Sequence, residues 1–440
     1  MLRNYLTIAL RFMLKQMGFT VINIFGLTVG ITCSLLILLY VNDEVRYDRF
    51  HPGADRIYRL GFQGKVQGKK MISAVTGSPV AAGIQSAIPE VESTLRMATW
   101  ATFPVRSHDN AFTEKYLLLA DSNFFRFFNF ELITGDPDNV LKGPGKIVIS
   151  ESAARRYFDY KGEGDLSPIG KKLMLAQGYE AEISGIAKDA PLNSHFHYSL
   201  ILSLVSWDEI PTSGWINGKV ITYFKLKPEA SIKAVSPNII SFLNRKVSEE
   251  LKEHKINIAR FKDQGDDMEF FIQPMLDIHL KSHLSNEIEI NGDIQYIYLF
   301  SSIAIFITLL ACINFMNLST ARSVSRAKEV GVRKTVGAQY GTIIRQFLLE
   351  SYLYIFIAVA IAFLLVLILM TPFNYFTEKQ LSLRTFGHPV FFVAALLFTL
   401  VIGLLAGSYP AFYLTRYGPL EVLKGKLRSS KRSTAFATSW

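Results

Sequence analysis

Residues 295–338 read QYIYLFSSIAIFITLLACINFMNL and then STARSVSRAKEVGVRKTVGA. The first part, residues 295–318, contains no charged side chain. A helix of this length measures about 36 Å, which is enough to cross the roughly 30 Å hydrocarbon core of a bilayer. The second part gathers basic side chains directly after it. This boundary predicts a transmembrane helix that emerges into a positively charged loop.

Three other segments have the same apolar texture. Residues 19–41 and 389–414 are uncharged, and residues 347–371 carry a single acid, Glu350. Segment 19–41 is longer than the apolar region of a typical signal peptide, and no small-residue cleavage site follows it. We therefore predict four transmembrane helices, which include 295–318, and an α-helical membrane protein.

The charges of the chain indicate how these helices are oriented. The 440 residues are 50% apolar and only 19% charged, with a net charge of +10. Segments 1–18, 319–346 and 415–440 hold 15 of the 47 basic residues and 2 of the 37 acidic ones. Because short cytoplasmic segments are enriched in Lys and Arg, these three are predicted to be cytoplasmic, together with both termini. Residues 42–294 are then a large extracytoplasmic domain, and 372–388 a short extracytoplasmic loop.

The basic residues also exclude one class of function. They flank the predicted spans and do not form a basic face with interleaved aromatic side chains, so no nucleic-acid partner is predicted. In the N-terminal arm, Arg3, Arg11 and Lys15 recur at helical spacing among apolar residues. This pattern predicts an amphipathic elbow helix that lies in the membrane interface.

The extracytoplasmic domain has a mixed α+β texture. Short apolar or alternating runs predict strands at 146–149, 182–186 and 221–226. Helical patterns predict helices at 150–158 and 231–254. Turn-rich segments separate these elements, and we expect an α+β domain in two lobes, inserted between the first and second transmembrane helices.

Chemical signatures are sparse along the whole chain. Both cysteines fall inside predicted spans, so no disulfide is expected in the exported domain. The pairs His195-x-His197 and His279-x-x-x-His283 lack an evident third ligand, so no metal site is predicted. Phosphate-binding, nucleophile-elbow and dinucleotide-binding motifs are absent from the sequence, so no catalytic residue and no cofactor on this chain are predicted.

The order of residues in the basic loop carries a resemblance to a known family. Residues 326–338, RAKEVGVRKTVGA, resemble the signature loop of the MacB/FtsX-like family of ABC transporter permeases. Other segments resemble that family along most of the chain, namely 48–51, 54–59, 121–125, 135–137, 193–196, 406–411 and 419–424. The resemblance implies one span, a large MacB-type periplasmic core domain and three further spans.

The resemblance also assigns a role to the loop. In the family it is a coupling helix that docks on an ATPase subunit, and here it corresponds to roughly residues 324–338. Glu329, Arg333 and Lys334 are the expected ion-pairing contacts, and Val330, Val332 and Val336 the expected packing contacts. We expect the helix to break at Gly331 and Gly337, because glycine permits a turn or the close approach of another backbone. The predicted coupling residues are Arg326, Lys328, Glu329, Val330, Gly331, Val332, Arg333, Lys334, Gly337 and Ala338.

Packing inside the membrane is predicted from two patterns. Gly26-x-x-x-Gly30 in the first span permits close helix contact, and Asn314 and Asn317 in the second can hydrogen-bond between helices.

The implied assembly is a bacterial inner-membrane permease without its own ATPase. Its partners would be a cytoplasmic ABC ATPase that binds ATP and Mg²⁺, a second permease copy or homologous half, the lipid bilayer, and a membrane-fusion protein or outer-membrane component. The family's substrates are macrolides, antimicrobial peptides and lipoproteins. Two alternatives stay open: an FtsX-like subunit that transports nothing and regulates a cell-wall hydrolase, or the N-terminal half of an eight-span permease. The substrate, the identity of the ATPase and the choice between homodimer and heterodimer also stay open.

Overall fold

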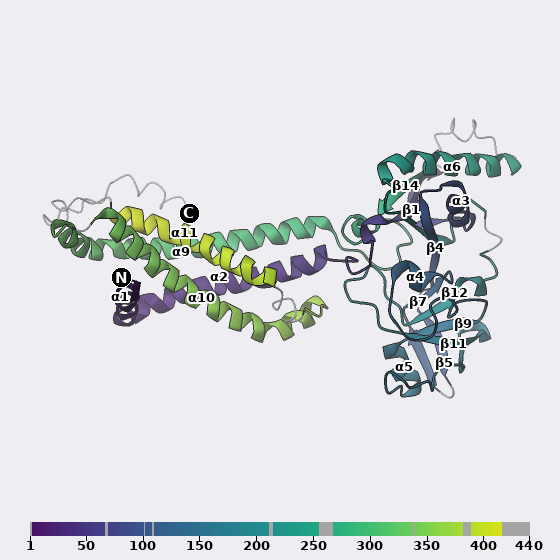
Figure 1. Cartoon of the computed structure of the whole chain (residues 1–440), viewed down its shortest axis with the longest axis horizontal. Helices are drawn as coiled ribbons and strands as arrows, with labels where there is room; N and C mark the ends of the chain where they lie inside the picture. The colour runs from purple at the N-terminus through teal and green to yellow at the C-terminus, as the bar shows by residue number, and fades with distance from the viewer. Residues whose placement is uncertain are drawn as a thin grey trace. The chain divides into compact units, whose positions relative to one another are not determined.

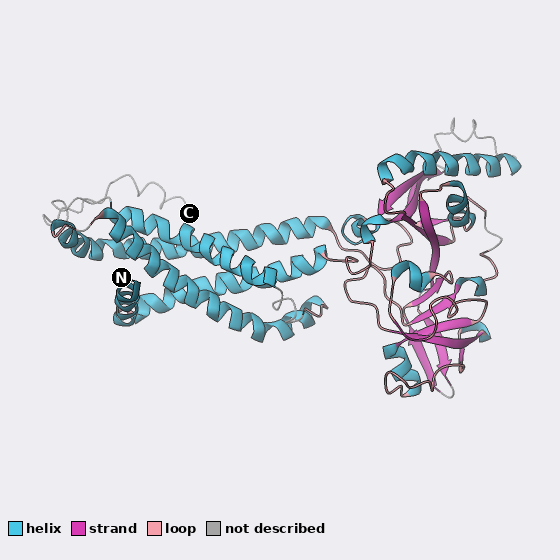
Figure 2. Cartoon of the chain, viewed as in Figure 1, coloured by secondary structure: helices cyan, strands magenta, loops and turns pink. Residues whose placement is uncertain are grey.

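The computed structural model describes residues 2–66, 69–100, 102–107, 110–210, 214–254, 267–337, 339–381 and 389–415 (Figure 1). The chain divides into two compact units. The first, here called the helical unit, takes in residues up to Asn42 and from Ile297 onward. The second, here called the sheet domain, is Asp43–Tyr296. Figure 2 shows that strands are confined to the second unit.

Among its described residues, the helical unit contains five helices: α1 (Leu2–Lys15), α2 (Met17–Val45), α9 (Ile294–Thr335), α10 (Tyr340–Thr377) and α11 (Pro389–Thr415). Of these, α2, α9 and α10 are long and apolar enough to cross a membrane. They confirm three of the four predicted spans as helices of that kind. The sequence of α11 is uncharged over 389–414, and among its described side chains the apolar helix is Leu396–Tyr409. The segment predicted as the elbow helix forms α1, and a single residue, Gln16, separates it from α2.

Helix α9 differs from the expected coupling loop. Its 42 residues run without a break from Ile294 through Gly331 to Thr335. The predicted break at Gly331 is therefore wrong, because one glycine costs only about 1 kcal/mol in a helix whose other residues favour it. The chain turns instead at Gly337, where φ is +94°. The expected separate coupling helix is the last part of α9.

In the part of the chain that the structure describes, the sheet domain has fourteen strands. Their bounds are β1 (Ile57–Val66), β2 (Lys69–Ser73), β3 (Val75–Thr76), β4 (Val91–Trp100), β5 (Phe103–Ser107), β6 (Asn110–Glu114), β7 (Leu117–Ala120), β8 (Leu132–Thr134), β9 (Lys146–Ser150), β10 (Lys172–Met174), β11 (Glu180–Ala187), β12 (Leu200–Ser203), β13 (Val220–Leu226) and β14 (Asp267–Pro274). The main path is β14-β1-β13-β4-β7-β12-β9-β11-β10-β5-β6. Pairs β7–β12 and β9–β11 are parallel, whereas the others are antiparallel.

Helices cover the two ends of this sheet. Their bounds are α3 (Pro79–Ala87), α4 (Phe124–Phe128), α5 (Glu151–Phe158), α6 (Ile232–Glu253) and α8 (Ile278–Lys281). Helices α3 and α6 share a hydrophobic core with β1, β4, β13 and β14 at one end, and α5 shares a second core with β7, β9, β11 and β12 at the other. The two expected lobes are thus two ends of one sheet.

Sequence patterns located several of these elements correctly. The predicted strands at 146–149, 182–186 and 221–226 are confirmed as parts of β9, β11 and β13. The predicted helices at 150–158 and 231–254 are confirmed as α5 and α6. Helix α5 begins where expected because Oγ of Ser150 caps it by accepting from the backbone nitrogen of Ala153 at 3.2 Å.

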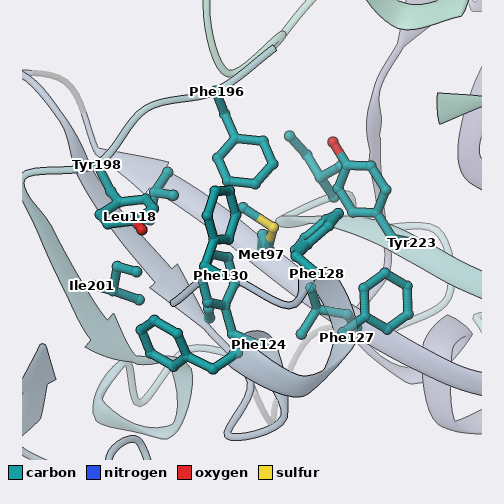
Figure 3. Close-up of a cluster of buried hydrophobic side chains, with 14 of the residues drawn as sticks. Met97, Leu118, Phe124, Phe127, Phe128, Phe130, Phe196, Tyr198, Ile201 and Tyr223 are labelled. Atoms are coloured by element: carbon teal, nitrogen blue, oxygen red, sulfur yellow. The ribbon is translucent and has the colours of Figure 1, made fainter. Parts of the chain in front are cut away.

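A third core lies between these ends and is rich in aromatic side chains (Figure 3). All four phenylalanines of α4, sequence FFRFF, are buried in it. Phe124 packs against Phe130, and Phe128 packs against Phe196 and Tyr223, with ring centroids 5 to 6 Å apart. Because a fully buried Phe contributes about 2–3 kcal/mol, this core is a major source of stability for the segments that meet in it.

Candidate functional site

The turn between α9 and α10 is where the sequence places the coupling residues. Val330 is buried, whereas Val332 and Val336 are 53% and 83% exposed. Thr335 closes the helix by donating from Oγ1 to the carbonyl oxygen of Val332 at 2.7 Å. The end of α9 therefore presents apolar side chains on its surface, next to a glycine turn.

Most of the other predicted coupling residues are described only as part of the backbone. The backbone of α9 includes six of them, namely Arg326, Lys328, Glu329, Gly331, Arg333 and Lys334. Their side chains, and the whole of Ala338, lie outside the described residues. Their role as contacts to an ATPase stays a prediction.

Small residues of α2 lie directly against α9. A Cβ at Gly26 would lie 3.0 Å from Nδ2 of Asn314, and one at Gly30 only 2.7 Å from the Cβ of Ala311. One turn beyond Gly30 on α2, Oγ of Ser34 donates to the carbonyl oxygen of Ala304 at 3.0 Å. The stripe Gly26, Gly30, Ser34 thus brings the two backbones close together. The other predicted packing residue, Asn317, is exposed on α9.

A second pair of glycines was missed by the sequence analysis. Gly403 and Gly407 of α11 face α10, where a Cβ at Gly403 would overlap the ring of Tyr352 and one at Gly407 would lie 2.9 Å from the Cβ of Ser351. The Tyr352 hydroxyl donates to the carbonyl oxygen of Leu400 at 3.1 Å. The Gly-x-x-x-Gly spacing is the same as in α2 and was the signal available in the sequence.

In the sheet domain, the segments that carried the resemblance meet at one place. Asp48 is fully buried, and its Oδ1 accepts from the backbone nitrogen of His195 at 3.0 Å and lies 2.8 Å from Nδ1 of the same residue. His195 Nε2 is hydrogen-bonded to the hydroxyl of Tyr223 at 2.8 Å. His51 donates from Nδ1 to the carbonyl oxygen of Phe128 at 2.8 Å.

A buried ion pair extends this cluster. Arg59, on β1, is fully buried, and its guanidinium contacts both carboxylate oxygens of Glu287 at 2.5 and 2.9 Å. It also donates to Oε1 of Gln273 at 2.7 Å and to Oγ of Ser282 at 2.8 Å. We call Asp48, His51, Arg59, His195, Tyr223 and Glu287 the buried polar cluster.

Burial and charge shift the pKa values of this cluster in opposite directions. Burial lowers the pKa of His51 to about 4, against smaller opposing effects of the Phe128 carbonyl and Asp48. Burial also raises the pKa of the Tyr223 hydroxyl. Burial alone would raise the pKa of Glu287, but the hydrogen bond and the charge of Arg59 outweigh it and hold that pKa below its ordinary value. The cluster therefore holds His51 neutral and Glu287 charged near neutral pH.

The same region fixes the chain where it leaves α2 and where it approaches α9. Glu44, in the last turn of α2, accepts from Nε2 of His279 at 2.8 Å, and the ring of Tyr47 stacks on that histidine. On the approach to α9, Glu289 accepts from the backbone nitrogen and Nδ1 of His197. The buried polar cluster and these contacts bind both connecting segments to the sheet.

The histidines considered as metal ligands thus have other partners. His195 and His197 face Asp48 and Glu289, and His279 faces Glu44. His283 lies 3.7 Å from Asp293. Within the described ranges, three or more His, Cys, Asp or Glu side chains are nowhere grouped so as to hold a metal ion. Since Asp48, His195 and Tyr223 are at most 4% exposed, this arrangement holds segments together and is closed to substrates.

Comparison with known proteins agrees with the division of the chain into a sheet domain and a helical unit. The family described as MacB-like periplasmic core domain matches residues 20–241, and the family described as FtsX-like permease C-terminal matches residues 301–419. Three helices that are long and apolar enough to cross a membrane, together with a match to the MacB-like periplasmic core domain, fit an inner-membrane protein.

Two curated relatives illustrate the similarity in sequence. The macrolide export ATP-binding/permease protein MacB of Mannheimia succiniciproducens is 34% identical over 126 residues, which is 28% of this chain and 19% of that protein. The protein of the same description from Shewanella sp. ANA-3 is 26% identical over 303 residues, or 68% of this chain and 42% of that protein. The chain thus matches less than half the length of either relative.

Two solved structures are similar to part of this chain. One is a domain of a protein assigned as a permease from Porphyromonas gingivalis, with 26% identity and a TM-score of 0.43, covering 51% of this chain and 91% of that one. The other is the periplasmic region of MacB from Actinobacillus actinomycetemcomitans, with 15% identity and a TM-score of 0.35, at the same coverage.

Proposed function

The chain belongs to the MacB/FtsX-like family of ABC transporter permeases, and on this premise we propose that it is the membrane subunit through which a separate ATPase moves a periplasmic domain. The ATPase would bind ATP and Mg²⁺ in the cytoplasm and dock on the turn between α9 and α10. Residues from Arg326 to Ala338 would form the contact, with the exposed Val332 and Val336 at its apolar centre.

The observation that carries this proposal is the continuity of α9. This helix runs for 42 residues from Thr335, beside the turn, back to Ile294. Ile294 follows directly on the segment that holds Glu287 and Glu289, which are bound to Arg59 and His197. A displacement of the turn would therefore be carried along one unbroken helix to a segment that is fixed to the sheet.

The membrane topology follows from the same reasoning. Helix α11 would be the fourth span, since it packs on α10 through Gly403 and Gly407. Both termini would be cytoplasmic and the sheet domain periplasmic, as the positions of Lys and Arg predict. A second copy or a homologous half would complete the transporter.

The substrate class is proposed from the relatives. They are named as macrolide export proteins, and we propose that this chain takes part in the export or extraction of amphiphilic molecules such as macrolides, antimicrobial peptides or lipoproteins. A membrane-fusion protein or outer-membrane component would receive them.

Docking is tested by co-purification with the ABC ATPase that forms a complex with the unaltered chain. We expect the double variant Glu329→Lys, Arg333→Glu to lose the ATPase, because it exchanges the charges at two contact positions one helical turn apart. The matched control is Glu151→Lys, Arg155→Glu on α5, an ion pair with the same spacing and order. Unchanged ATPase binding by the first variant would contradict the docking site.

A further inference from the structure

The sheet domain contains a cavity whose lining residues belong neither to the buried polar cluster nor to the turn between α9 and α10. Its volume is about 190 Å³, and it opens among β1, β2, β3, β14 and the segment 214–218. Its walls include Phe62, Met71, Val75, Trp215, Phe270 and Asn286. A cavity of about 150 Å³ is enough for a benzene ring, so this one exceeds an ordinary packing defect.

Three aromatic side chains, those of Phe62, Trp215 and Phe270, line the cavity. The rings of Phe62 and Phe270 meet edge to face, with centroids 6.1 Å apart. Met71 lies beside them and is 50% exposed, so it stands at the mouth. Aromatic edges and a thioether both pack favourably against another aromatic ring.

Trp215 also lines the cavity, and its position is fixed. The backbone nitrogens of Trp215 and Ile216 donate to Oε2 of Glu250 on α6, at 2.6 and 3.2 Å. The ring fills the space beside Gly83 of α3 and meets Phe242 edge to face. The cavity is therefore formed before any ligand arrives.

One side of the cavity is polar. Nδ2 of Asn286 donates to Oγ of Ser73 at 3.1 Å. Within the described part of the chain, this is the hydrogen bond of the Asn286 side chain. The oxygen of the same amide group, Oδ1, can therefore accept a hydrogen bond from a ligand. A ligand with a ring for the apolar walls and a donor for Oδ1 matches this combination.

We propose that the cavity binds an aromatic amphiphile: a ring of about phenyl size that carries a hydrogen-bond donor, such as a phenolic hydroxyl. The inference rests on the proposed function, because it places part of an amphiphilic substrate in the domain that the ATPase would move. It also supplies a connection. Asn286 directly precedes Glu287, the partner of the buried Arg59, so the ligand contacts the segment that leads to α9.

Binding is measured on the full chain in lipid nanodiscs, without ATPase, so that a failure of the coupling proposal leaves the result interpretable. Trp100, Trp207 and Trp440 are replaced by Phe, which leaves Trp215 as the single reporter. The probe is 4-bromophenol, whose bromine quenches indole fluorescence at contact. We expect saturable quenching, weakened at least tenfold by Val75→Phe, which fills the cavity. Val205→Phe, at a valine 50% exposed elsewhere in the domain, is the control that leaves binding unchanged.

Two further comparisons keep the outcome decisive. If Val75→Phe does not fold, Met71→Glu at the mouth replaces it, with the partly exposed Met174→Glu as its control. The acceptor is tested by 4-bromoanisole, which lacks the donor and is expected to bind several-fold more weakly than 4-bromophenol. Asn286→Gly, which suits the φ of +60° at this position, should abolish that difference. Quenching that rises linearly with probe, or saturable quenching that the cavity variants do not change, would overturn the proposal.

Discussion

Nδ1 of His195 lies 2.8 Å from Oδ1 of Asp48, although 147 residues separate them in the chain. The contact joins the segment that follows α2 to the loop before β12, and both belong to the segments by which the sequence resembles its family. Arg59, in a third such segment, belongs to the same cluster. Its positive charge lowers the pKa of the Tyr223 hydroxyl, against the larger effect of burial, which raises it. These residues bind the connecting segments to the sheet domain.

The ion pair of Arg59 with Glu287 is expected to be strongly stabilising. Glu287→Leu leaves the guanidinium buried without its counter-charge, which costs about 3–5 kcal/mol. Chemical denaturation of the detergent-solubilised chain, followed by tryptophan fluorescence, measures this loss. Glu182→Leu is the control, because its ion pair with Lys146 is half exposed and is worth less than about 1 kcal/mol. Equal losses in the two variants would contradict the assigned role.

Acid is expected to destabilise the sheet domain through His51. Its pKa is 6.5 ordinarily and about 4 in the folded protein. Between these values the unfolded chain binds a proton that the folded chain does not, so stability is intact above pH 6.5 and falls as the pH decreases towards 4. From pH 6.5 to 5 the loss is about 2 kcal/mol.

The measurement is the free energy of unfolding at pH 7 and at pH 5. The range stays above the ordinary pKa of 4.5 for Glu287, whose folded pKa is lower still. His51→Gln should flatten the difference between the two pH values, whereas His254→Gln, at a side chain 67% exposed, should preserve it. A pH dependence that survives His51→Gln would assign the effect to another group.

Close packing of α2 on α9 predicts a contrast between two glycines of one helix. Gly30→Ala places a methyl group within 2.7 Å of the Cβ of Ala311, and relief of this overlap should cost about 1–3 kcal/mol. Gly18→Ala meets nothing within 4 Å and should be neutral or slightly stabilising. Thermal unfolding in mild detergent compares the two. A Gly30→Ala variant as stable as Gly18→Ala would rule out a tight interface.

The pair α10–α11 gives the corresponding test of the glycines that sequence analysis missed. Gly403→Ala overlaps the ring of Tyr352, so we expect a lower melting temperature and a weakened Tyr352–Leu400 hydrogen bond. Gly341→Ala, near the start of α10, has open space around it and serves as the control. The comparison uses the same thermal assay, and no difference between the variants would contradict the packing.

Local pattern was sufficient for the long apolar helices, for α5 and α6, and for several strands. Uncharged runs located α2, α9 and α10, and the cap at Ser150 located α5, because these signals act within one or two turns of the chain. The sequence did not predict that Asp48 meets His195 or that Arg59 meets Glu287. Those contacts depend on the order of strands in a mixed sheet, which adjacent residues do not determine. Gly331 misled for a different reason, since a long helix tolerates a single glycine.

We propose above that ATP hydrolysis by an ATPase docked on the α9–α10 turn moves the sheet domain. The direct test uses a chain with Cys33→Ala and Cys312→Ala that carries one spin label at Leu166→Cys, a residue 62% exposed in the sheet domain. It is reconstituted with its ATPase in nanodiscs, and the distance between the labels of two copies is measured with and without ATP. We predict that ATP shifts this distance and that Glu329→Lys, Arg333→Glu abolishes the shift. A complex that hydrolyses ATP while the distance stays the same would contradict the account.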